Sequence, residues 1–305
     1  MRVFVMMMMM MLMMMMMMLL MLLVGVGVVV LGSGRAKGYR PVVIVHGIFD
    51  GPKQFRMLSR FIKQAHPGTE VVTLALYDYM SSLRPLWQQI GGFSRALTSI
   101  MSRSPAGVHL LCYSQGGLIC RALLHTLPHH NVHSFISLSS PQAGQYGDTH
   151  YLRWLFPERL KRNVFRMCYN NFGQKISICD YWNDPHHRAR YLARSSFLPL
   201  INAERHHALA QHWKENFLRI RKLVLIGGPD DDVITPWQSS HFGFYDGQEN
   251  IVDMRNQDYY KEDGFGLKTL DGRGGVELCQ CSGVKHVAWH SNYSVFTGCI
   301  KPWLT

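Results

Sequence analysis

The sequence has few acidic residues and no dense basic tract. Its 305 residues include 32 Lys and Arg against 20 Asp and Glu, which gives a formal net charge of +12. The basic residues are scattered, and no run of them alternates with aromatic side chains, so the charge predicts a basic protein surface and no nucleic-acid partner. Such a surface still favours transient contact with anionic membranes or phosphate groups.

The paired, closely spaced Cys and His residues of a zinc site are also missing. The seven cysteines are Cys112, Cys120, Cys168, Cys179, Cys279, Cys281 and Cys299. Only Cys279 and Cys281 lie close together, and one such pair does not make a zinc site, so we expect no metal. Because the number of cysteines is odd, at least one thiol stays unpaired or pairs between chains.

After residue 31 the sequence has no apolar run long enough to cross a membrane. Before that point, one run extends from Val3 to Leu31 behind a basic residue, and small residues follow it. This order predicts a secretory signal peptide over residues 1–36, cleaved near Gly34 or Ala36. Because a signal core usually has about 7–15 apolar residues and a membrane span takes roughly 20, an uncleaved signal anchor is the alternative.

A secretory route affects the interpretation of two further features. Cysteines of exported chains usually form disulfides, so we expect disulfides in this chain. Asn292 begins the only N-glycosylation sequon, Asn-Tyr-Ser, and is the expected glycan site.

Residues 37–305 alternate between short apolar runs and segments with apolar residues at helical spacing. The runs that predict strands cover 41–45, 71–76, 108–111, 133–138 and 222–226. Continuous apolar strands separated by helices are typical of a mostly parallel sheet with helices on both faces, so we expect a single α/β domain. The alternation breaks after the strand near 133–138. There, a long, aromatic-rich and partly helical insertion of about 145–215 predicts either a lid over a binding groove or a peripheral helical layer.

The predicted strand over 108–111 leads into the run Cys-Tyr-Ser-Gln-Gly at 112–116, and an apolar helix follows. A strand, a sharp turn with a central Ser and a helix are typical of the nucleophile elbow of the α/β-hydrolase fold. Cys112 stands where Gly is usual, but Cys is also small and Gly116 leaves room on the helix side. We therefore expect an α/β-hydrolase fold with Ser114 as its nucleophile, activated by a neighbouring base.

In this fold the acid and the histidine follow the serine along the chain. The loop after the strand at 222–226 carries three adjacent carboxylates, Asp230–Asp232, and each of them could orient an imidazole. Three histidines come later, His241, His286 and His290, and His286 lies close to the C-terminus before a last helical run. The residues alone favour His286 as the base and leave the acid open.

Two backbone N–H groups must also meet the negative charge that develops on the substrate oxygen. The residue after the nucleophile, Gln115, is expected to supply one of them. His46 and Gly47 end the first buried strand, as in the oxyanion loops of many lipases and esterases, so Ile48 is expected to supply the other.

Several segments together resemble the palmitoyl-protein thioesterase family, most closely its lysosomal branch. They are VIVHGIFD at 43–50, CYSQGGLIC at 112–120, SLSSPQAGQYG at 137–147, CDYWNDPHH at 179–187, GGPDD at 227–231, VITPW at 233–237, FGFY at 242–245 and HVAWHSN at 286–292. The resemblance extends from about residue 40 to the end of the chain. It implies Ser114, Asp231 and His286 as the catalytic residues, with the acid identified by counting back from the FGFY segment.

The same resemblance implies three disulfides, Cys112–Cys120, Cys168–Cys179 and Cys279–Cys299, and leaves Cys281 unpaired. The implied activity is hydrolysis of long-chain fatty acyl thioesters, such as acyl-CoA, through an acyl-enzyme and without a cofactor. The acyl chain would then lie in a groove built in part by the 145–215 insertion. The implied location is the lysosome, reached through the secretory pathway and the lysosomal sorting machinery, with secretion as a further outcome.

Two other functions remain open at the level of sequence. A lipase or carboxylesterase would cleave oxygen esters with the same catalytic residues, because the acyl-enzyme chemistry is the same. A non-catalytic hydrolase fold that binds lipids would share the sheet without needing every catalytic group. If His286 is the base, activity is expected to fall as this residue becomes protonated in acid.

Overall fold

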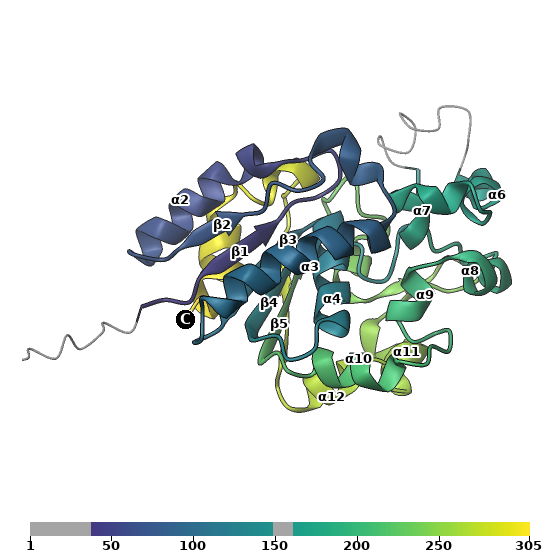
Figure 1. Ribbon diagram of the computed structural model, residues 1–305. Helices are drawn as coiled ribbons and strands as arrows, with labels where there is room; N and C mark the ends of the chain where they lie inside the picture. The colour runs from purple at the N-terminus through teal and green to yellow at the C-terminus, as the bar shows by residue number, and fades with distance from the viewer. Residues whose placement is uncertain (1–37, 149–160) are drawn as a thin grey trace, which may run out of the picture. The chain divides into compact units, whose positions relative to one another are not determined.

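A six-stranded parallel sheet forms the centre of the computed structural model, which describes residues 38–148 and 161–305 (Figure 1). The strand order is β2-β1-β3-β4-β5-β8 and every neighbouring pair is parallel. The strands are β1 Val42–Val45, β2 Val71–Thr73, β3 Val108–Tyr113, β4 Val132–Leu138, β5 Lys222–Gly227 and β8 Val276–Gln280. This topology confirms the predicted α/β architecture.

Helices cover both faces of the sheet, which explains why its central strands are almost completely buried and mainly apolar. All residues of β1 and β3 are buried. Val43 and Leu110 face the core formed with α3 and α4, whereas Val42 and Leu111 face the core formed with α2 and the C-terminal helices. Burying one such side chain contributes about 1.5–3 kcal/mol to folding. The two cores therefore hold the strands in place from both sides of the sheet.

Helices occupy segments between and after the strands. They are α2 Arg56–Ala65, α3 Leu86–Ser102, α4 Gln115–Thr126, α6 Val164–Cys168, α7 Ser177–Tyr181, α8 Arg188–Arg194, α9 Leu198–Ile201, α10 Ala210–Phe217, α11 Asp258–Lys261, α12 Leu267–Gly272 and α13 Tyr293–Val295. A short antiparallel pair, β6 Phe244–Tyr245 and β7 Ile251–Val252, lies apart from the main sheet. Within the described ranges, no helix is long and apolar enough to cross a membrane.

The structure differs from the predicted strands at the end of β2 and at three strands that were not predicted, the short β6 and β7 and the longer β8. β2 ends at Thr73, although the apolar run continues to residue 76. β8 was not predicted, because this strand lies at the edge of the sheet and none of its five residues is fully buried. An edge strand that is half exposed lacks the continuous apolar run by which the buried strands were identified.

The described part of the 145–215 insertion packs as a helical layer. Trp182, Tyr191 and Phe197 are 0 % exposed and belong to the same core as α3 and α4. The ring of Trp87 in α3 lies 5.1 Å from that of Phe197, centroid to centroid. Residues 149–160 of the insertion lie outside the described residues, as does the predicted signal peptide at 1–36.

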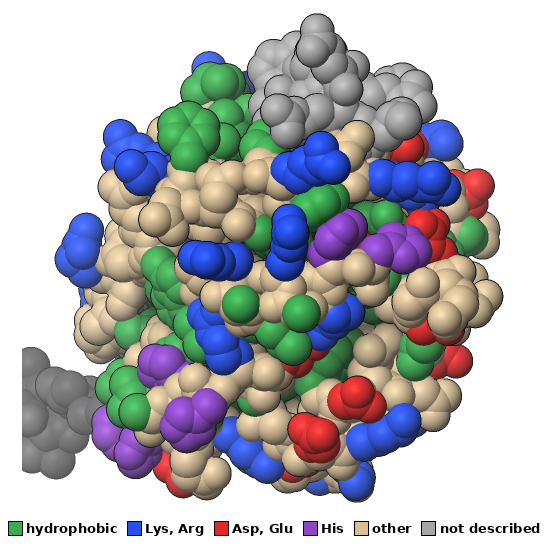
Figure 2. Space-filling view, turned by 90° about the vertical axis from the view of Figure 1, so that its right-hand side faces the viewer, with side chains coloured by type: hydrophobic (Ala, Val, Ile, Leu, Met, Phe, Trp, Pro, Cys, Tyr) green, Lys and Arg blue, Asp and Glu red, His purple; other side chains and the backbone are tan. Residues whose placement is uncertain are grey.

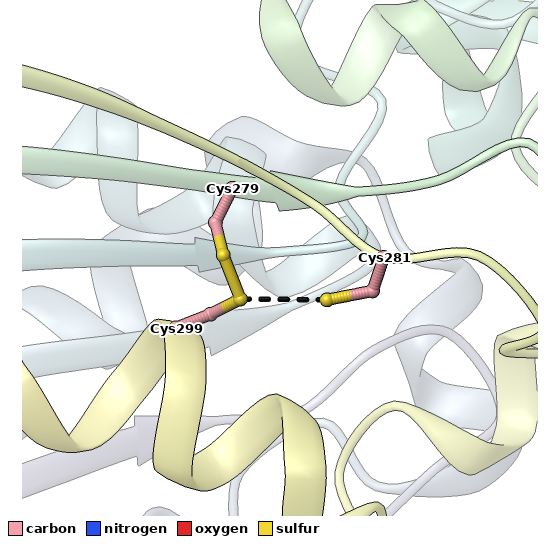
Figure 3. A group of neighbouring side chains, drawn as sticks. All are labelled: Cys279, Cys281 and Cys299. Carbon is pink, nitrogen blue, oxygen red and sulfur yellow. Dashed lines mark hydrogen bonds between the residues drawn. A yellow bond between two sulfur atoms is a disulfide. The ribbon is translucent and has the colours of Figure 1, made fainter.

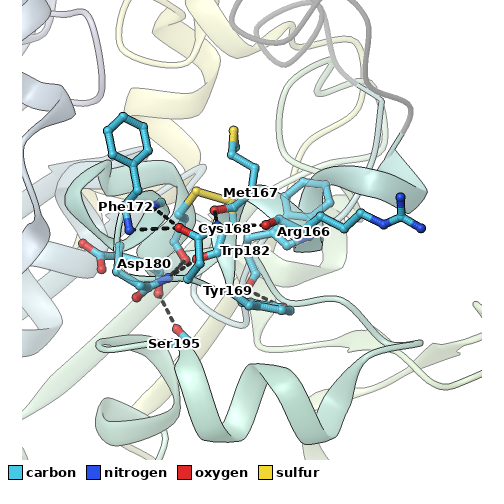
Figure 4. Close-up of a disulfide and its surroundings, with 12 residues drawn as sticks. Arg166, Met167, Cys168, Tyr169, Phe172, Asp180, Trp182 and Ser195 are labelled. Carbon is cyan, nitrogen blue, oxygen red and sulfur yellow. Dashed lines mark hydrogen bonds between the residues drawn. A yellow bond between two sulfur atoms is a disulfide. The ribbon is translucent and has the colours of Figure 1, made fainter.

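The three disulfides implied by the resemblance are all present. Cys168–Cys179 joins α6 to α7 (Figure 4), and Cys279–Cys299 joins β8 to the C-terminal helical segment (Figure 3). Cys281 is a free thiol, and its Sγ lies 3.4 Å from the Sγ of Cys299. The three sulfur atoms of this cluster lie within 4.8 Å of one another. Because the disulfide occupies two of them, the cluster offers one thiol and not the several thiolates of a metal site.

Candidate active site

Ser114 lies in the sharp turn between β3 and α4. Its φ of 52° and ψ of −129° belong to a region that residues other than Gly rarely adopt, as expected for a nucleophile elbow. Gly116 permits the close approach of α4, since a Cβ there would lie 2.5 Å from the carbonyl oxygen of His46. The Cys112–Cys120 disulfide joins the end of β3 to α4. The unusual Cys in the elbow is thus half of a bridge across the turn.

His286 reaches Ser114 from the loop that follows β8. Its Nε2 lies 3.0 Å from Ser114 Oγ, and both residues are 4 % exposed. The hydroxyl of Tyr113, next to the serine, donates a 2.8 Å hydrogen bond to the carbonyl of His286. With the ring proton on Nδ1, Nε2 can accept the proton of Ser114 Oγ. The histidine that the sequence favoured is therefore the one that the fold brings to the serine.

Asp231 contacts the other nitrogen of the His286 ring. Its Oδ2 and Oδ1 lie 2.9 and 3.1 Å from Nδ1. The indole of Trp289 donates to Oδ2 over 2.7 Å, and the N–H groups of Val233 and Ile234 each donate to Oδ1 over 2.9 Å. Burial raises the pKa of this carboxyl, but hydrogen bonds and the charge of His286 outweigh burial and hold the pKa at about 2. Asp231 is thus a carboxylate that orients the imidazole.

The two neighbouring carboxylates bind the backbone of the histidine loop. Asp230 Oδ2 accepts a 2.7 Å hydrogen bond from the N–H of Gly283, and Asp232 Oδ1 accepts a 3.0 Å bond from the N–H of His286. Three adjacent aspartates therefore make three different contacts, and only the side chain of Asp231 touches the ring. The sequence could not distinguish among them.

Ser139 is a site residue that the sequence reasoning missed. It follows β4 directly, and its hydroxyl donates to Asp231 Oδ2 and lies 3.0 Å from His286 Nδ1. β4 pairs with β3, the strand that carries Ser114. Polar residues at the carboxyl ends of neighbouring parallel strands meet at one edge of the sheet, and this signal could have identified Ser139.

The predicted oxyanion donors flank the serine. Gln115 begins α4, and the loop that carries Ile48 passes beside the nucleophile, because a Cβ on Gly47 would lie 2.8 Å from Ser114 Cβ. The next amide along this loop, Phe49 N–H, already donates to Ser82 Oγ over 2.8 Å. No hydrogen bond from the N–H of Ile48 or Gln115 to another described residue is found. Among the described residues, neither amide therefore has a hydrogen-bond partner that would compete with a substrate oxygen.

Ser82 anchors the loop that carries Ile48, and it was also missed from the sequence. Its carbonyl oxygen accepts hydrogen bonds from the Nε2 atoms of Gln115 and Gln89, both over 2.8 Å, and from Ser177 Oγ over 2.9 Å. This network fixes the side chain of the residue after the nucleophile. It depends on segments far apart in the chain, so no local motif signals it.

The other candidate bases do not contact Ser114. The ring of His290 packs 5.2 Å from that of Tyr113, and burial with the nearby charge of His286 lowers its pKa to about 4. Burial likewise lowers the pKa of His241 to about 4. Neither ring is a hydrogen-bond partner of the serine hydroxyl among the described residues.

A family model and several curated relatives match most of the chain. A family model described as palmitoyl protein thioesterase matches residues 41–286. Lysosomal thioesterase PPT2 of Rattus norvegicus and of Homo sapiens are each 58 % identical over 267 residues, covering 88 % of this chain and 88 % of the relative. A PPT2 homolog of Drosophila melanogaster is 42 % identical over 266 residues, covering 87 % of this chain and 92 % of its own.

Solved structures show a more distant likeness. The mature lipase BlEst2 of Bacillus licheniformis is 17 % identical with a TM-score of 0.47, covering 88 % of this chain and 93 % of its own. A lipase-esterase related protein of Clostridium acetobutylicum is 16 % identical with a TM-score of 0.44, covering 83 % and 89 %. Likeness at this level says nothing about the substrate.

Proposed function

The chain belongs to the palmitoyl protein thioesterase family, and on this premise we propose that Ser114, Asp231 and His286 carry out its hydrolysis of fatty acyl thioesters. The supporting observation is that the three side chains are hydrogen-bonded in sequence. Ser114 Oγ lies 3.0 Å from His286 Nε2, and His286 Nδ1 lies 2.9 Å from Asp231 Oδ2. This arrangement supplies a nucleophile, a base and a carboxylate that holds the base.

In the first half of the reaction, His286 takes the proton of Ser114 as Oγ attacks the thioester carbonyl. Asp231 stabilises the imidazolium that forms, because its carboxylate stays ionised beside Nδ1. The amides of Ile48 and Gln115 bind the oxyanion of the tetrahedral intermediate. The carbon–sulfur bond then breaks, the thiol leaves with the proton from His286, and the acyl group remains on Ser114 Oγ.

In the second half, water replaces the thiol. His286 takes a proton from the water as its oxygen attacks the acyl-enzyme, and the same two amides bind the second oxyanion. Collapse of this intermediate releases the fatty acid and returns the proton to Ser114. No cofactor takes part in any of these steps.

We assign the acyl chain to a groove built in part by the 145–215 insertion. The curated relatives are named lysosomal thioesterases, and we place this chain in the lysosome on that basis. We further propose that it travels through the secretory pathway, loses residues 1–36, carries a glycan on Asn292 and is delivered by the lysosomal sorting machinery. Asn292 caps α13 through its side-chain oxygen, which accepts from Val295 N–H over 3.1 Å, and this bond leaves the amide nitrogen for a glycan.

The test is hydrolysis of palmitoyl-CoA by the Ser114→Ala variant. We expect kcat to fall by roughly 10⁴-fold or more, while Ser102→Ala, at the exposed end of α3, keeps the wild-type rate. Labelling by a fluorophosphonate should be lost in the first variant only. Full hydrolysis by Ser114→Ala would overturn the assignment.

Cleavage of oxygen esters is the second candidate activity, because the same groups serve both reactions. Matched oxygen and sulfur esters of one acyl chain separate the two activities. A higher kcat/KM for the oxygen ester would make the chain a carboxylesterase in practice.

A further inference from the structure

The helical segment from residue 161 to 194 carries exposed positive charge and no exposed negative charge. Its basic residues are Lys161, Arg162, Arg166, Lys175, Arg188, Arg190 and Arg194. Its two carboxylates, Asp180 and Asp184, are 0 % exposed. Figure 2 looks onto the side of the molecule that holds α6, α7 and α8, and there Lys and Arg side chains surround apolar ones. The segment 161–194 therefore carries an excess of exposed positive charge, which attracts anions.

Several of these cations have no carboxylate partner in the part of the chain that the structure describes. Lys161 and Arg188 form ion pairs with Glu249 and Glu204. Among the described residues, no carboxylate lies within ion-pair distance of the other five basic side chains. The guanidinium groups of Arg166 and Arg190 lie 5.7 and 5.1 Å from the centre of one ring, that of Phe165, so both cations border the same aromatic side chain.

Two of the unpaired cations repel each other along α8. Arg190 and Arg194 are four residues apart, both are exposed, and side chains at this spacing lie on the same face of a helix. Like charges so placed destabilise a helix in the absence of a counter-ion. An anion bound between them would remove this repulsion.

Phe172 adds a large apolar side chain to the same region. It is 73 % exposed, and the turn beneath it is rigid, because Asn170 Oδ1 accepts hydrogen bonds from the N–H groups of Phe172 and Gly173 over 2.9 and 3.0 Å. The Cys168–Cys179 disulfide closes the loop that contains this turn. Figure 4 shows Phe172 and Met167 extending to the same side of the disulfide, away from Asp180. The fold thus holds an aromatic ring in water.

Phe172 and two of the cations line one open hollow of about 790 Å³ between the turn at 169–172 and α8. A small soluble anion would need only the cations. A membrane with anionic headgroups offers phosphate groups to the arginines and hydrocarbon to the phenylalanine. We propose that the protein docks on an anionic lipid membrane through a docking face made of Arg166, Phe172, Arg190 and Arg194.

Docking of this kind would bring the enzyme to the surface where long acyl chains are held. The proposal does not depend on the assignment of the catalytic residues, because binding is measured without turnover. The experiment is co-sedimentation of the full chain with vesicles of phosphatidylcholine that contain about 30 mol % phosphatidylserine, compared with vesicles of phosphatidylcholine alone. The wild type should sediment only with the anionic vesicles and should be released at about 0.5 M salt.

The double variant Arg190→Gln/Arg194→Gln is expected to lower the partition coefficient about 30-fold, because each basic residue near an anionic surface contributes about five-fold. The matched control is Arg56→Gln/Arg60→Gln, an exposed pair with the same spacing on α2, which lies far from α8 in Figure 1. The control should change binding less than about three-fold. Circular dichroism and thermal unfolding show that each variant is folded.

Equal losses in the two double variants would overturn the proposal, since net charge alone would then explain binding. Wild-type binding to uncharged vesicles would overturn it as well. Phe172→Ser should weaken binding without changing its dependence on salt. If Phe172→Ser binds as the wild type does, the surface holds anions without entering a membrane, and the proposal fails.

Discussion

Asp180 makes a contribution to stability that depends on pH and can be worked out from its surroundings. Its side chain is fully buried, with Leu86 N–H donating to Oδ2 over 2.7 Å and Ser196 Oγ donating to Oδ1 over 2.9 Å. Burial outweighs these two bonds and raises the pKa of the carboxyl to about 7. This pKa is higher in the folded than in the unfolded chain, so the folded state binds a proton more tightly. The free energy of unfolding that Asp180 contributes therefore decreases as the pH rises from about 4 to about 7.

The size of this effect follows from the pKa difference of about three units, each of which corresponds to about 1.4 kcal/mol. Asp180→Asn removes the ionisation and keeps the shape, since an amide can still accept from Leu86 N–H and can donate to Ser196 Oγ. We expect the variant to match the wild type near pH 4. Near pH 8 it should be more stable by about 4 kcal/mol, or roughly 10 °C in Tm.

The quantity to measure is the difference in the free energy of unfolding between the wild type and Asp180→Asn, because buried histidines titrate over the same pH range. Burial lowers the pKa values of His109 and His130 to about 4, so each of these groups reduces stability as pH falls below its unfolded pKa. Their effect is common to both proteins and cancels in the difference. Urea unfolding of both proteins from pH 4 to pH 8 gives that difference directly, and a value that does not change with pH would refute the reasoning. Ser196→Ala removes a hydrogen bond to the charged carboxylate of Asp180. The pKa of Asp180 in the folded protein should therefore rise, and the loss of stability should extend to higher pH.

Two further predictions concern the site and the cysteine cluster. Ser139→Ala should lower kcat for palmitoyl-CoA by about 10- to 100-fold with KM unchanged, because a hydrogen bond to a charged group contributes about 1.5–3 kcal/mol. A change in KM alone would contradict a role in positioning His286. At alkaline pH the thiolate of Cys281 should attack Cys299 and release Cys279, so peptide mapping should find a Cys281–Cys299 bridge in the wild type and none in Cys281→Ser. Burial raises the pKa of Cys281, so the exchange should be slow in acid, and finding only the original bridge after alkaline incubation would contradict this prediction.

The sequence predicted the parts of the molecule that depend on local pattern. The buried strands are continuous apolar runs, and Ser114 lies in a strand–turn–helix motif whose geometry requires small neighbours. Ser139 and Ser82 could not be identified in the same way, since each acts through contacts with segments remote in the chain. The edge strand β8 was missed because half-exposed residues leave no apolar run.

The choice of the acid shows most clearly where local pattern stops being informative. Asp230, Asp231 and Asp232 are chemically identical neighbours, and their side chains differ only in direction. That direction is set by the path of the loop between β5 and the 3₁₀ helix that follows Pro236, and by the approach of the histidine loop. The resemblance to the family identified Asp231 as the acid, by its distance from the FGFY segment, whereas the composition of the loop could not.

The contacts of these three aspartates require that their loop keeps its length. Asp230 and Asp232 bind the loop of Gly283 and His286 at two points, and Asp231 faces the ring between them. Deleting or inserting one residue would place a side chain of the same charge but the wrong direction opposite the imidazole. The two loops therefore form a matched pair, which protein engineers would have to transplant together and at constant length.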